Sequence, residues 1–75
     1  MFKNKILVEI PTNALSTIYI DADEIEGLED LGMDKRPGVV TKTAIHMKSR
    51  KTFLTKLHVT EVMRRINNVL LNYQL

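Results

Sequence analysis

Cysteine is absent from this 75-residue sequence, and so is tryptophan. Without cysteine the chain can form neither a disulfide nor a thiolate zinc site, and two histidines alone are too few to hold a metal. A chain of this length buries only about 60–65% of the surface that its unfolded form exposes, so its core supplies little stability. We therefore expect no metal, no cofactor, and self-association as the way to bury more surface.

Long hydrophobic runs are also missing. The apolar residues 6–8 are followed by Glu9 and Pro11, so this run is far shorter than the roughly 7–15 apolar residues of a signal peptide. It is shorter still than the roughly 20 residues of a membrane-spanning helix. The sequence predicts a cytoplasmic protein with no membrane partner.

Lysine and arginine are scarce in the first half of the chain, and aspartate and glutamate are scarce in the second half. Residues 1–34 carry a net charge of −6 and residues 35–75 carry +8, although the formal net charge of the chain is only +2. The two halves can fold against each other and cancel their fields. Alternatively, they can present two oppositely charged faces to a partner or to a neighbouring copy.

A β-branched, leucine-rich centre before Pro11 predicts a strand at residues 5–10. Alternation and β-branched residues predict three more, at residues 17–21, 39–47 and 52–57. A short connection joins the first pair and another joins the last pair, as in antiparallel hairpins. We expect an α+β fold with a single domain, residues 1–75. In it, a small antiparallel sheet of four to five strands is covered by one C-terminal amphipathic helix.

Residues 25–31 fit two interpretations. Ile25, Leu28 and Leu31 recur at every third position, which a short helix can accommodate. Gly27 disfavours a helix interior, however, and favours a third strand with a bulge at this glycine. The strand is the favoured prediction, and the helix stays open.

A 3.6-residue period predicts a helix over residues 59–73. Either His58 together with Glu61, or the Thr60 hydroxyl, can cap its start. The predicted apolar stripe consists of Val59, Val62, Met63, Ile66, Val69, Leu70 and Tyr73. Leu71 and Leu75 widen this arc beyond what one sheet needs, which indicates contact with a second subunit. The candidate residues for an oligomer or partner interface are Val69, Leu71, Tyr73 and Leu75.

The connection between the last two predicted strands is basic. Long cationic side chains replace the counterions of phosphates, so this hairpin can bind an anion. Only Phe53 offers a stacking surface nearby, and its neighbours place it in the core. The candidate anion-binding residues are Lys42, Lys48, Arg50, Lys51 and Lys56. Solvated lysines also protect sheet edges from aggregation, which is the alternative interpretation.

The acidic residues 21–26 allow a hard-cation site or a solvated acidic turn that is capped by Asp21. The run lacks the glycine and the spacing of a calcium loop, so we favour the turn.

No constellation supports catalysis. His46 and His58 lie twelve residues apart, with no cysteine in the chain and no carboxylate expected to act with them, which is a weak case for acid–base or metal chemistry. Ser16 and Ser49 lack the flanking glycines of a nucleophile elbow. We interpret both histidines as structural and predict no catalytic residues.

The order of these elements resembles the FlbD-like small proteins associated with bacterial flagella. The matching residues are 18–20, 23–26, 43–47, 49–51, 53–55 and 60–66. Arg50 stands where that family has a glycine. The chain is also similar to small strand-rich accessory proteins of bacteriophages. The resemblance implies a small adaptor or regulator in a bacterial or phage-infected cell, with no active site to carry over.

Together these observations predict a non-enzymatic, homo-oligomeric binding or adaptor protein. As a bacteriophage accessory protein or a bacterial regulator, it would bind a host or cellular protein. The alternative is a protein that binds, or sequesters, nucleic acid or an anionic nucleotide through the basic hairpin.

Overall fold

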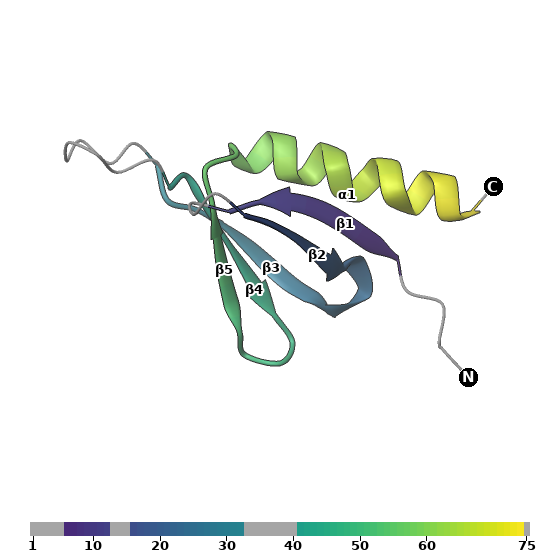
Figure 1. Ribbon diagram of the computed structural model, residues 1–75, viewed down its shortest axis with the longest axis horizontal. Coiled ribbons are helices and arrows are strands. Elements are labelled where there is room, and N and C mark those ends of the chain that lie inside the picture. The colour runs from purple at the N-terminus through teal and green to yellow at the C-terminus, as the bar shows by residue number, and fades with distance from the viewer. Residues whose placement is uncertain (1–5, 13–15, 33–40, 75) are drawn as a thin grey trace.

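The computed structural model describes residues 6–12, 16–32 and 41–74, with the backbone alone for residues 73 and 74. Its elements are β1 (Leu7–Pro11), β2 (Thr17–Asp21), the 3-10 turn η1 (Ala22–Glu24), β3 (Ile25–Asp30), β4 (Thr43–Met47), β5 (Thr52–Thr55) and α1 (Val59–Gln74). The α+β class is as predicted, with one C-terminal helix beside antiparallel strands (Figure 1).

The strands form two sheets where one was predicted. β1 pairs with β2, and β3, β4 and β5 form a separate three-stranded sheet in that order. η1 separates the two, because it redirects the chain between β2 and β3. The predicted cap of this turn is confirmed: the Asp23 N–H donates to the Asp21 carboxylate at 3.0 Å. Alternation identifies the residues of a strand but not the neighbour to which the strand bonds.

β3 settles the alternative that the sequence left open. Residues 25–30 form a strand, and its register with β4 shifts between Ile25 and Gly27, so the predicted bulge is confirmed. β4 is shorter than predicted, because it begins at Thr43 and not at residue 39. Residues 39 and 40 lie outside the described residues.

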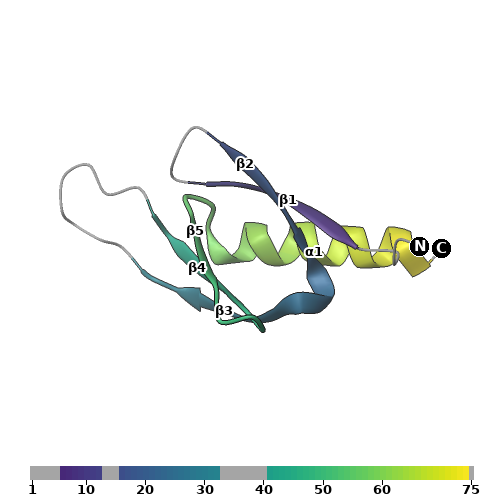
Figure 2. The ribbon, with the colours of Figure 1, turned by 60° about the horizontal axis from the view of Figure 1, so that its bottom comes forward.

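The apolar faces of both sheets pack against one core. The buried cluster consists of Val8, Ile10, Ile20, Ile45, Met47 and Val62. Phe53 packs against it partly buried, in line with its predicted core position. Figure 2 shows β1–β2 on one side, the three-stranded sheet on the other, and α1 spanning the space between them. Val62, fully buried, is the helix residue that reaches the centre of this core.

Two fully buried threonines connect these layers. The Thr55 hydroxyl donates to the Pro11 carbonyl at 2.6 Å and accepts the Leu57 N–H at 3.2 Å. The Thr43 hydroxyl donates to the Leu57 carbonyl at 2.7 Å. Their polar atoms are therefore satisfied, and the end of β5 is tied to the end of β1.

The edge of β1 that faces away from β2 is covered by side chains. β1 bonds to β2 through its even-numbered residues, as the 2.8 Å bond from Ala22 N to Ile6 O shows, so the odd-numbered carbonyls point to the other edge. There the Arg65 guanidinium donates to the Glu9 carbonyl at 3.0 Å. The next carbonyl on this edge belongs to Pro11, which already accepts a hydroxyl and has no N–H of its own.

Candidate interaction surfaces

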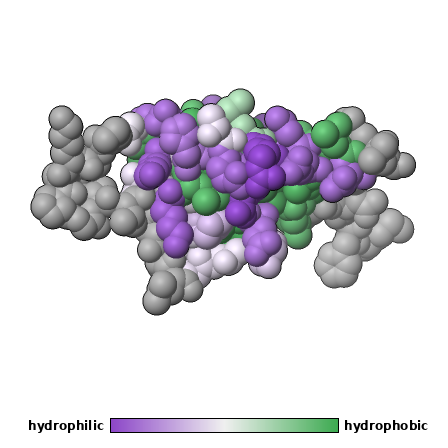
Figure 3. Space-filling view, turned by 90° about the horizontal axis from the view of Figure 1, so that it is seen from above, coloured by the Kyte–Doolittle hydropathy of each residue, from purple (hydrophilic) through white to green (hydrophobic). Residues whose placement is uncertain are grey.

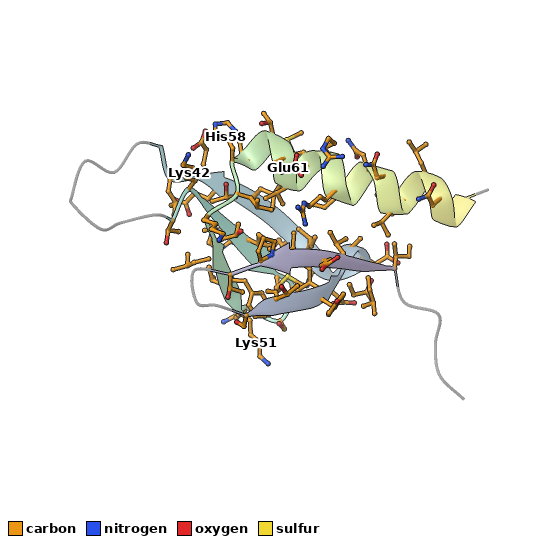
Figure 4. All side chains as sticks on the ribbon, turned by 45° about the horizontal axis from the view of Figure 1, so that its top comes forward. Lys42, Lys51, His58 and Glu61 are labelled. Atoms are coloured by element: carbon orange, nitrogen blue, oxygen red, sulfur yellow. The ribbon has the colours of Figure 1, made fainter. Side chains whose placement is uncertain are left out.

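The candidate anion-binding residues are divided between the two ends of the β4–β5 hairpin. Lys48, Arg50 and Lys51 lie at its tip, whereas Lys42 precedes β4 and Lys56 follows β5. Figure 4 shows Lys42 and Lys51 at opposite ends of the strands. β4 has five residues, so it spans about 17 Å, and the five cations do not converge on one phosphate-sized ligand.

The tip of the hairpin holds Arg50 in a strained conformation. The Arg50 N–H donates to the Met47 carbonyl at 2.9 Å, and the Met47 N–H donates to the Lys51 carbonyl at 2.9 Å. Closing this turn gives Arg50 a φ of 72°. This is the left-handed region, where tight hairpin turns favour glycine. The chain thus keeps a long cationic side chain at a position that glycine would occupy without strain.

The acidic turn lies beside this basic tip. The Lys48 N–H donates to the Glu24 carbonyl at 2.8 Å, so the two oppositely charged parts of the chain meet through their backbones. Across residues 6–12, 16–32 and 41–74, no group of three or more histidine, aspartate or glutamate side chains is placed to hold a metal ion.

A hydrogen-bonded row crosses the outer face of the three-stranded sheet. His46 Nε2 lies 2.9 Å from Glu29 Oε1, and His46 Nδ1 lies 3.2 Å from Thr52 Oγ1. The interpretation that His46 has no carboxylate nearby is wrong, because Glu29 reaches it from another strand. The row has the connectivity of a nucleophile, a base and an orienting carboxylate. The His46 and Glu29 side chains are 42% and 58% exposed, so the row lies open to water. We interpret the row as a cross-strand link.

His58 is the N-cap of α1. Its Nδ1 accepts the Thr60 N–H at 3.2 Å, and its carbonyl accepts the Glu61 and Val62 N–H groups at 2.9 and 3.1 Å. The cap is therefore the histidine and not the Thr60 hydroxyl, which instead lies 2.9 Å from His58 Nδ1. Its structural role agrees with the interpretation from the sequence.

The first turns of α1 carry a cluster of ion pairs. Glu61 binds Arg64 and Arg65 through its two carboxylate oxygens. The hydrogen bonds from Arg64 and then Arg65 lower the pKa of Glu61 to about 2. The hydrogen bond to Glu61 in turn raises the pKa of Arg64 above its usual value. Arg65 thus joins Glu61 to the edge of β1.

The candidate interface residues of α1 differ in exposure. Val69 is half-buried and lines a hollow of about 230 Å³ between β1 and α1, and Leu71 is 61% exposed. The Tyr73 side chain and Leu75 lie outside the described residues. Met63, which the predicted stripe placed in the core, is 50% exposed, because it faces away from the buried side of the helix. Figure 3, which looks down on α1, shows hydrophilic side chains along the helix interrupted by hydrophobic ones.

The outer face of β1–β2, called face A below, exposes apolar side chains that the sequence analysis missed. It is formed by three cross-strand pairs that alternate with the buried ones: Leu7 with Asp21, Glu9 with Tyr19, and Pro11 with Thr17. Leu7 is 48% and Tyr19 is 63% exposed. The alternation within each strand contained this signal, because it assigns one face to the core and leaves the other in water.

The outer face of the three-stranded sheet, called face B below, also exposes apolar side chains, and a lysine lies at its end. Its strand residues are Gly27, Glu29, Ala44, His46, Thr52 and Leu54. Leu54 is 45% exposed and Leu31, directly after β3, is 40% exposed. The Leu31 N–H donates to the Lys42 carbonyl at 2.9 Å, which extends the ladder by one residue and places Lys42 beside this face.

Within the described residues, no helix combines the length and apolar character that crossing a membrane requires. No protein-family model, no curated protein and no solved structure matches the chain.

Proposed function

We propose that this chain is a small homo-oligomeric binding or adaptor protein that acts through protein contact and not through catalysis. Exposed apolar side chains carry the proposal. Six large ones are between 40% and 63% exposed: Leu7, Tyr19, Leu31, Leu54, Met63 and Leu71. They lie on both sheets and on α1, and where two of them share one face, as Leu7 and Tyr19 do on β1–β2, they are candidates for a binding surface.

The small core supports the same proposal. Eight apolar residues are classed as buried among those described, and α1 contributes Val62 as its fully buried one. A chain of 75 residues without cysteine has little else to stabilise it, so burying further apolar area between copies brings a substantial gain.

The resemblance to FlbD-like and bacteriophage accessory proteins extends the proposal to a partner. In this reading the oligomer works in the bacterial cytoplasm as a regulator or phage accessory protein, and binds a host protein. The resemblance supports an adaptor role because it implies no active site.

Sedimentation equilibrium at micromolar concentration tests the oligomer. The expected result is a mass well above the 8.6 kDa of one chain, rising with concentration. A stable monomer across this range would contradict the proposal.

A second candidate is anion binding at the tip of the β4–β5 hairpin, and the left-handed Arg50 favours it. Strained residues cluster at functional sites, and Arg50 lies between Lys48 and Lys51 at the exposed tip of the hairpin. The adjacent Glu24 backbone brings acidic residues close to this tip, which makes it the weaker of the two candidates.

Gel-shift titration with DNA, RNA and cyclic nucleotides tests this second candidate. We expect binding that weakens steeply with salt and is lost in Arg50→Glu/Lys51→Glu. Lys42→Glu/Lys56→Glu makes the same change of charge at the other end of the hairpin and serves as the matched control. The absence of any shift at low salt removes the candidate.

A further inference from the structure

Carboxylates and cations are segregated between the two hairpins. Residues 6–26 contain five carboxylates and no lysine or arginine, whereas residues 41–56 contain five lysines and arginines and no carboxylate. The first segment builds β1, β2 and η1, and the second builds β4 and β5. The charge division of the sequence therefore becomes a division between the β1–β2 hairpin and the β4–β5 hairpin, whereas β3, which pairs with β4, carries Glu26, Glu29 and Asp30.

The ion pairs among the described residues do not join the charges of one hairpin to those of the other. The described salt bridges join Glu29 to His46, and Glu61 to Arg64 and Arg65. Among the described side chains, none joins a carboxylate of residues 6–26 to a cation of residues 41–56. Each hairpin therefore keeps its own field and attracts a surface of opposite charge.

On the outer face of each sheet, charged side chains lie beside exposed apolar ones. Face A carries Leu7 and Tyr19 beside Glu9. Face B carries Leu54, with Leu31 and Lys42 at its end, and the Glu29 carboxylate on this face is bonded to His46. An apolar centre with a charged rim is the composition of a specific protein interface.

We infer that face A of one copy binds face B of the next copy, so that the chains assemble head to tail. The inference rests on the proposed homo-oligomer and specifies how it forms. Pairing face A with face A would bring Glu9 and Asp21 against the same carboxylates, and like charges across an interface are strongly unfavourable. Two different faces make a heterologous contact, which produces a ring or an open chain of copies.

Two double variants each remove one of these faces. Glu9→Lys/Tyr19→Lys reverses face A, and Lys42→Ser/Leu54→Ser removes the attraction of face B. The four side chains are exposed, so both variants should fold, and circular dichroism checks this. Each variant alone should be monomeric in sedimentation equilibrium, with association at least about tenfold weaker than that of the unmodified chain.

Mixing the two variants provides the decisive measurement. Each retains one intact face, so an equimolar mixture should form a 1:1 dimer that does not grow further. A mixture that stays monomeric overturns the head-to-tail arrangement, and so does either variant assembling alone. Leu71→Ser, on α1, is the control and should assemble like the unmodified chain; if this change disperses the oligomer, α1 is the interface and the inference fails.

Salt dependence gives a second readout. Assembly should weaken from 0.05 to 0.5 M sodium chloride, because ions screen the attraction between the two faces. An oligomer that ignores salt and both variants overturns this inference but retains the proposed function. An unmodified chain that is monomeric at every salt concentration overturns both.

Discussion

At the scale of single residues, two hydroxyls connect parts of the chain that are far apart in sequence. Thr55 is fully buried, and its one oxygen serves both the Pro11 carbonyl and the Leu57 N–H. Thr43 is equally buried but makes a single such bond, to the Leu57 carbonyl. The two threonines therefore form a natural pair for measuring what each bond contributes.

Replacing Thr55 with valine keeps the shape of the side chain and removes its hydroxyl. We expect Thr55→Val to lower the free energy of unfolding by roughly 2 kcal/mol, because two partly buried backbone groups lose their partner. Thr43→Val should cost about half as much. Urea unfolding followed by circular dichroism measures both, and equal or smaller losses for Thr55→Val would show that its bonds are replaced by water.

His46 and Arg50 show how far single residues could be predicted. The strand that carries His46 was predictable from local alternation, but its Glu29 partner comes from a strand 17 residues earlier, and no local pattern specifies such a register. Arg50 was recognisable as an unusual hairpin residue. Its left-handed backbone follows only once the turn closes between paired strands.

At the scale of elements, α1 depends on its first turns. His58 caps the helix, and Glu61 links Arg64 to Arg65, which in turn binds the edge of β1. An acidic residue in the first turn also interacts favourably with the helix dipole. This end of α1 thus combines capping, ion pairing and contact with a sheet.

Acid should weaken α1 through Glu61. Its pKa is about 2 in the folded chain against an ordinary value of 4.5. A lowered carboxylate pKa gives stability that is complete above the ordinary value and is lost as the pH falls from about 4.5 towards 2. Glu61→Gln should lower the urea midpoint at pH 7 and flatten its decline over that interval. Urea titrations at pH 7, 4 and 2 measure this, and an unchanged decline would contradict it.

The elements themselves were largely accessible from sequence, but their pairing was not. Strict alternation identified β2 at its observed bounds of residues 17–21, and Gly27 located the bulge in β3. The division into two sheets depends on how η1 redirects the chain, and a run of acidic residues does not specify that direction. Similarly, the helical period placed Met63 within the predicted apolar stripe of α1. The two sheets cover only part of that stripe, and Met63 lies in the part that stays exposed.

At the scale of the whole molecule, α1 joins two sheets that share no strand. Val62 lies with residues of both sheets in one buried cluster and is fully buried there. The helix is therefore part of the core and not an appendage, and the two sheets should unfold together with it.

Truncating Val62 should destabilise all elements at once. We expect Val62→Ala to cost about 2 kcal/mol, from two lost methyl groups and the cavity that they leave. The urea midpoints of the helix signal, by circular dichroism, and of the sheet amides, by hydrogen exchange, should move together. Met63→Ala, at a neighbouring exposed position, is the matched control and should change stability by less than about 0.5 kcal/mol. A helix that melts before the sheets would contradict this.

The covered edge of β1 has a consequence for the order in which the chain folds during synthesis. The β1–β2 hairpin emerges from the ribosome before β5 and α1, but its edge carbonyls at Glu9 and Pro11 are bound by Arg65 and Thr55, which lie 56 and 44 residues further along. Until those residues emerge, the nascent hairpin presents an open edge to which other strands can add. Chains that terminate before β5 should therefore aggregate. The final third of the sequence protects the first strand from pairing with other chains, because it supplies the side chains that cover its edge.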